Sequence, residues 1–167
     1  MPHLLVDQLR FAHSELVRSL DGITPEEAVQ RLMPMNSLSW IVGHLADQEQ
    51  RYFLIGQGLE PAVPGLNDLV GFGKPASTPP LADMWAAWDA VTSATAPLLV
   101  AMTDDDLLAL PPAGGPPGES NGTLLLRVIT HYWFHIGEGQ AIRQLLGHTN
   151  LPTFVGAIGQ EAPFRVD

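Results

Sequence analysis

The stretch that decides the fold is THYWFHIGEGQAIRQLLGH, residues 130–148. Its apolar residues recur in alternating steps of four and three, which is the periodicity of a helix with one face turned to a core. The same stripe starts a few residues earlier in the chain. Both ends of the stripe are apolar, whereas its middle is His, His and Glu, so a core-facing helix carries a polar island. In order, the stripe is Leu124, Val128, His131, His135, Glu138, Ile142 and Leu145.

The composition is that of a folded protein. Hydrophobic residues make up 46% of the 167 residues and charged residues 16%, which favours a globular chain over a disordered one. A chain of this length can bury a core without crosslinks, so we expect one domain over residues 1–167. Cysteine is absent, which excludes disulfides, thiolate metal sites and cysteine nucleophiles.

The charge balance narrows the range of partners. Eight Lys and Arg residues stand against eighteen Asp and Glu residues, a formal net charge of −10. Such a surface repels phosphate backbones and anionic lipid headgroups, so we expect neither nucleic acid nor a membrane as a partner. The N-terminal residues lack the pattern of a signal peptide, and no apolar segment approaches the ~18 residues that span a bilayer. We therefore expect a cytoplasmic protein.

Helical periodicity recurs in four long segments, whereas no segment alternates cleanly as a strand would. Asn36 or Ser37 should cap the second segment and Thr78 the third. Pro97 should kink the third helix or end it early. Short capped turns should follow Thr24 and Thr103. The four segments cover about residues 2–20, 36–58, 78–97 and 121–146.

Two connections are rich in glycine and proline. Residues 56–80 hold five of each, too many for regular structure, and residues 111–122 are denser still. Loops of this length in a compact domain are usually functional or disordered, and these two could frame the mouth of a pocket. Four helices with one long crossover between the second and third predict an all-α four-helix bundle.

The polar island could hold a metal ion. His131 and His135 are four residues apart on a helix, a spacing at which two imidazoles can converge on one ion. His44 or His13, each beside an apolar face of another helix, could supply a third imidazole. The alternative is a set of hydrogen-bonded core histidines, since a single histidine on an apolar face is more often that than a ligand. Clustering favours the metal, because burying these groups without a shared partner would be costly.

Three segments of the chain resemble the DinB/YfiT-like family of metal-dependent four-helix proteins. They are SLSWIVGHLADQEQRYF, PPLADMWAAWDAVTSAT and HYWFHIGEGQAIRQLLGHTNLPTFVG, and the resemblance extends over about residues 4–159. The metal triad of that family is one histidine on the second helix and an H-x-x-x-H pair on the last. The resemblance therefore implies His44, His131 and His135 as ligands. His13 matches no family ligand, so we expect it in the core or on the surface.

Three neutral imidazoles leave at least one position of the ion open, as catalytic sites do. We expect zinc or nickel, with iron(II) or manganese as alternatives. Glu138, close after His135 on the stripe, could be a fourth ligand, an acceptor for an imidazole N–H or a catalytic general base. Gln48 is a weaker candidate for such support, and Arg51 and Arg143 could bind an anionic substrate.

The resemblance implies a function for this site. Relatives with known activity use low-molecular-weight thiols such as mycothiol or bacillithiol, so the leading hypothesis is a thiol-dependent transferase with a small-molecule substrate. A metal-dependent hydrolase would use the same ligands. A non-catalytic metal- or ligand-binding stress-response protein is a further alternative. The apolar segment NLPTFVGAIGQEAPF, residues 150–164, could pack in a homodimer or cover a groove of its own bundle.

Overall fold

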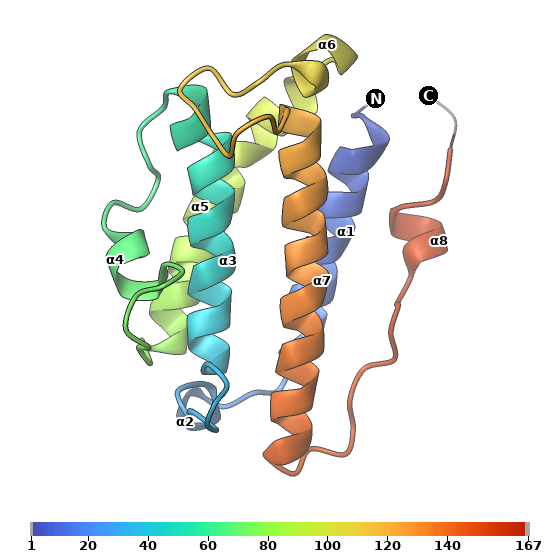
Figure 1. The fold of residues 1–167 in the computed structure, drawn as a ribbon. Coiled ribbons are helices and arrows are strands. Elements are labelled where there is room, and N and C mark those ends of the chain that lie inside the picture. The colour runs from blue at the N-terminus through green and yellow to red at the C-terminus, as the bar shows by residue number, and fades with distance from the viewer. Residues whose placement is uncertain (1, 166–167) are drawn as a thin grey trace.

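The computed structural model describes residues 2–165, which contain helices and no strands. Figure 1 shows that two of the four long helices run in one direction and the other two in the opposite direction. Two parallel neighbours, α3 and α5, need a long crossover between them, and the chain supplies it. The predicted all-α bundle is thereby confirmed. The long helices are α1 (Leu4–Ser19), α3 (Leu38–Phe53), α5 (Leu81–Ala101) and α7 (Asn121–Leu145).

Most helix ends lie where their capping residues predict them. Ser37 accepts a hydrogen bond from the backbone N–H of Trp40 at the start of α3. Thr24 and Thr103 each form a capping box, and these boxes open the short helices α2 (Pro25–Ala28) and α6 (Asp104–Leu108). None of the helices in residues 2–165 is long and apolar enough to cross a membrane.

Helix α5 begins later than predicted, and of the two effects expected of Pro97 the early end does not occur. It begins at Leu81 with Pro80 as its N-cap, and not after Thr78. The reason is that Thr78 and Pro79 each precede a proline, which disfavours the helical conformation. Pro97 does not end the helix, which continues to Ala101. The carbonyl that loses its partner lies one turn earlier, on an exposed part of the helix where water can bind it.

The first long connection is more regular than predicted. It contains the 3₁₀ helix η1 (Ile55–Gln57) and the helix α4 (Leu66–Val70), so the prediction of no regular structure in residues 56–80 is wrong. The first and last residues of α4 lie one turn apart and are both buried, and α4 packs against α3. Burial of this small apolar face outweighs the local bias of the glycines and prolines.

A single buried carboxylate joins all four long helices. Glu49 of α3 is fully buried, and its Oε2 lies 2.9 Å from Nε2 of His13 on α1. Thr95 of α5 donates a hydrogen bond to Oε1 of Glu49 (2.7 Å), and Tyr132 of α7 donates one to Oε2 (2.9 Å). His13, which we expected in the core or on the surface, thus belongs to a buried polar network, which we call the Glu49 network.

The C-terminal segment folds back along α1, where the short helix α8 (Ile158–Glu161) lies beside it (Figure 1). Arg18 of α1 donates a hydrogen bond to the carbonyl of Thr153 (2.8 Å), and the N–H of Gly156 donates to Glu15 (3.1 Å). These contacts favour the alternative in which the segment covers its own bundle. The homodimer stays a prediction.

Candidate metal centre

The three histidines singled out in the sequence come together between α3 and α7. One nitrogen from each of His44, His131 and His135 lies within 4.8 Å of the others, which is a grouping that could hold a metal ion. His44 and His135 are buried, with 6% and 5% of their surface exposed, and His131 is half-buried. The i,i+4 pair and the histidine on the second long helix, which were both named from the sequence, therefore lie together in one cluster.

The crossover connection orients His44. Nδ1 of His44 lies 2.9 Å from the carbonyl oxygen of Val70, at the end of α4. Because a carbonyl can only accept, Nδ1 carries the proton and Nε2 keeps its lone pair. Trp40 stacks on the same imidazole, with ring centroids 4.3 Å apart and planes 17° apart. The imidazole is thus held on one edge and on one face, and it offers Nε2 to the cluster.

Glu138 orients His135 in the same way. Nδ1 of His135 lies 2.7 Å from Oε2 of Glu138, one turn further along α7. The carboxylate oxygen accepts this hydrogen bond, so His135 also keeps a lone pair on Nε2. Of the three roles considered for Glu138, this contact favours the acceptor of an imidazole N–H. Carboxylate–histidine pairs of this kind fix the ring and make it a better ligand.

The contact between His131 and His135 is the strongest sign that the cluster suits a cation. Their Nε2 atoms lie 3.0 Å apart. Since His135 presents a lone pair there, His131 must donate its Nε2 proton in the absence of an ion. That leaves Nδ1 of His131 as a buried acceptor with no hydrogen-bond partner. A divalent ion could bind both Nε2 lone pairs at once, at the ~2.0–2.1 Å that zinc prefers for nitrogen, so the donor set fits such an ion.

Burial keeps the imidazoles of His44 and His131 uncharged, as metal ligands must be. Removal from water and, to a smaller extent, the neighbouring His135 lower the pKa of His44 to about 4, against the opposing effect of the Val70 hydrogen bond. Burial likewise lowers the pKa of His131 to about 3, with contributions from His135 and His44. Both side chains are therefore neutral at pH 7.

These pKa values predict an acid-sensitive metal-free protein. Below pH ~6.5 the unfolded chain binds protons at His44 and His131 that the folded protein does not bind. We therefore expect the free energy of unfolding of chelator-stripped protein to decrease from pH ~6.5 to ~4. Urea titrations at several pH values measure it. The variant His44→Gln, which can still donate to the Val70 carbonyl, should show a shallower decrease, whereas equal slopes would contradict this origin.

The contact between Glu138 and His135 predicts a moderate effect on metal affinity. Replacing Glu138 with alanine removes the acceptor of the His135 N–H, and loss of such a partner typically weakens metal binding by about 10–100-fold. Glu138→Gln keeps an acceptor without the charge and should lose less. Competition with a chromophoric zinc chelator measures both affinities. If Glu138 were instead a catalytic base, both variants would bind zinc as tightly as the wild type.

The other polar residues that the sequence suggested for the site lie in different parts of the structure. Gln48 lies beside the cluster, and its Oε1 is buried without a hydrogen-bond partner. Arg51 pairs with Asp47 (3.0 Å), and Arg143 donates to a backbone carbonyl at the far end of α1. Neither arginine lines the cleft beside His131, so the suggestion that they bind an anionic substrate finds no contact there.

Two functional features were missed in the sequence. The Val70 carbonyl is a backbone group, and the residue type at a position does not predict that its carbonyl will contact a histidine. Arg127 does line the cleft beside His131, and its position four residues earlier on α7 places it on the same helical face. That spacing was a usable signal.

The fold and the cluster together define a helical bundle with three histidines that could bind a metal ion. The chain belongs to the DinB superfamily, whose sequence model matches residues 8–138. The matched range contains the three histidines and Glu138, which is its last residue. The resemblance stated from the sequence is confirmed at the level of this superfamily. A comparison with curated proteins gives no match.

Proposed function

We propose that this protein is a metal-dependent transferase that holds a divalent ion on His44, His131 and His135 and acts on a low-molecular-weight thiol. The observation that supports the proposal is the convergence of three imidazole nitrogens within 4.8 Å. The protons on two of the rings are held away from that point by Val70 and Glu138. Imidazole nitrogen suits zinc and nickel, which we favour over iron(II) and manganese.

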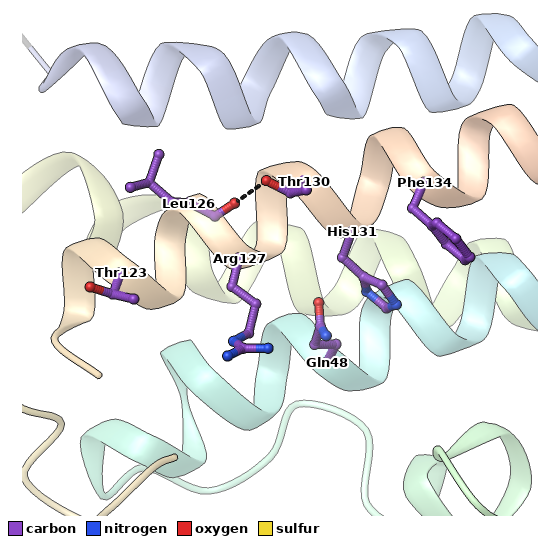
Figure 2. Close-up of a pocket in the computed structure, with 7 residues that line it drawn as sticks. All are labelled: Gln48, Thr123, Leu126, Arg127, Thr130, His131 and Phe134. Atoms are coloured by element: carbon purple, nitrogen blue, oxygen red, sulfur yellow. Dashed lines mark hydrogen bonds between the residues drawn. The ribbon is translucent and has the colours of Figure 1, made fainter. Parts of the chain in front are cut away.

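A bound ion of this kind lowers the pKa of a thiol and keeps its sulfur as the nucleophilic thiolate. The cluster supplies only three ligands, which leaves room for that sulfur. A cleft of about 510 Å³ opens beside His131 and gives a small molecule access (Figure 2). In the transfer, the sulfur forms a bond to an electrophilic carbon as the bond from that carbon to its leaving group breaks. The thiol proton passes to solvent.

The test uses protein purified without an affinity tag. Elemental analysis should find about one zinc or nickel per chain. The loaded protein should conjugate mycothiol or bacillithiol to chlorodinitrobenzene with release of chloride, and a chelator or His44→Ala should abolish the reaction. A protein that takes up neither metal contradicts the proposal. A loaded protein that hydrolyses esters but transfers no thiol would instead favour the hydrolase, and a loaded protein without either activity would favour a non-catalytic role.

A further inference from the structure

The cleft beside the cluster has an apolar wall and one cationic side chain. Leu126 and Phe134 of α7 form the apolar wall and are 51% and 67% exposed. Arg127 is the only Lys, Arg, Asp or Glu among the residues that line the cleft. Figure 2 shows Arg127, Gln48 and His131 in a row along it. The lining residues are Gln48, Thr123, Leu126, Arg127, Thr130, His131 and Phe134.

The guanidinium of Arg127 is held in place by some of its donors, and others remain available to a ligand. It donates through Nε (2.8 Å) and Nη2 to the carboxylate of Glu119, in the loop before α7. Its Nη1 has no hydrogen-bond partner among residues 2–165. A guanidinium is a planar fork that matches a carboxylate, and part of this fork remains available. The pairing with Glu119 shows that a carboxylate fits on Arg127 at this position.

Arg127 and His131 are one helical turn apart, a spacing that places Cβ atoms about 5–6 Å from each other. A single small molecule can therefore reach both residues. The protein as a whole is strongly acidic, with a net charge of −10, so a cation in the wall of a cleft is the local feature that would attract an anion. A neutral ligand would gain less from this residue, because it could accept a hydrogen bond but would lack the charge attraction.

We propose that the cleft selects an acidic, partly apolar substrate. Its carboxylate lies on Arg127, its apolar body lies against Leu126 and Phe134, and its reacting end lies at the three-histidine cluster. The last of these three contacts rests on the proposed function, whereas the first two do not. That carboxylate accepts from Nη1 of Arg127, while Glu119 holds Nε and Nη2.

The first experiment uses cobalt-loaded protein and two probes of equal length, 3-mercaptopropionate and 3-mercaptopropionamide. Binding changes the visible spectrum of the cobalt. We expect the acid to bind about tenfold more tightly than the amide, as one charge-assisted hydrogen bond at a half-exposed site allows. Arg127→Gln should remove the preference, because it lowers the affinity for the acid much more than the affinity for the amide. Glu119→Gln should raise the affinity for the acid, because it removes the negative charge beside the free Nη1.

Arg10→Gln is the matched control. Arg10 lies on α1 and pairs with Asp7, and its exposed fraction of 50% is close to the 47% of Arg127. It therefore reports the effect of losing one positive charge at a distance from the cleft. If Arg10→Gln lowered the preference for the acid as much as Arg127→Gln, the selectivity would be a general charge effect, and the proposal would be overturned.

The second experiment separates this inference from the metal. Hexanoate and hexanamide are added to metal-free protein, and binding is followed by the backbone NMR signals of residues 123–134. Weak binding of hexanoate that exceeds that of hexanamide, and that Arg127→Gln abolishes, supports the acid subsite even if the protein never binds a metal. Equal binding of the two probes in both experiments overturns it, whatever the metal content and thiol activity prove to be.

Discussion

Replacing His131 with alanine should lower the affinity for zinc by at least about a hundredfold while the metal-free protein stays folded. Zinc sites owe ~10–16 kcal/mol of apparent binding free energy to a few ligands, so losing one of three removes a large share. The fold should tolerate the change, because His131 is half-buried and its Nδ1 has no partner. Its replacement leaves one buried polar atom newly unpaired, the Nε2 acceptor of His135.

Calorimetric titration with zinc measures this loss, and urea unfolding of the chelator-stripped variant measures its stability. His148→Ala is the matched control. His148 is also a half-buried histidine, but it bonds to Glu27 and Arg143 at the end of the bundle and lies outside the cluster. It should bind zinc like the wild type. An unchanged zinc affinity in His131→Ala would show that the cluster is not the metal site.

The second large effect concerns stability. Glu49→Ala should lower the free energy of unfolding by about 3–5 kcal/mol, because it leaves the groups of His13, Thr95 and Tyr132 without the buried carboxylate that they contact. Burial alone would raise the pKa of Glu49, but His13 and the hydrogen bonds from Thr95 and Tyr132 outweigh it and lower the pKa. The stabilisation is thus present above the ordinary carboxyl value of 4.5 and is lost as the pH falls through the lower folded value.

Urea unfolding at pH 7 measures the effect, with Glu60→Ala as the control. Glu60 is an exposed glutamate in the crossover connection, so its replacement should change the free energy of unfolding by less than about 0.5 kcal/mol. Glu49→Gln retains an acceptor for Thr95 or Tyr132 and should fall between the two. A Glu49→Ala protein as stable as Glu60→Ala would mean that the Glu49 network contributes nothing net to the fold.

The sequence predicted what depends on neighbours in the chain. The capping boxes at Thr24 and Thr103 and the i,i+4 pair His131 and His135 are local patterns, and helical geometry alone converts them into structure. The choice of His44 over His13 as the third candidate ligand followed from the resemblance to a family. The start of α5 was predicted wrongly, although the signal was local: a proline after Thr78 was given less weight than the cap.

The sequence could not predict what depends on packing between distant segments. A glutamate on an amphipathic helix is ordinarily a surface residue, so nothing marked Glu49 as buried. Its three partners come from three other helices, and only the assembled bundle places them together. The cleft is likewise a product of assembly, since Gln48 reaches it from α3 while the other lining residues belong to α7.

Tyr132 and His131 are consecutive residues of α7 that face different parts of the protein. Tyr132 is tied to Glu49 in the interior, and its hydroxyl also accepts a hydrogen bond from Trp88 (2.8 Å). The backbone that carries His131 is therefore held in place without an ion. Binding of an ion by the cluster would then cost little ordering entropy, and such preorganisation raises affinity without any additional ligand. In small zinc-dependent folding domains the order is reversed, since there the ion must assemble its own site.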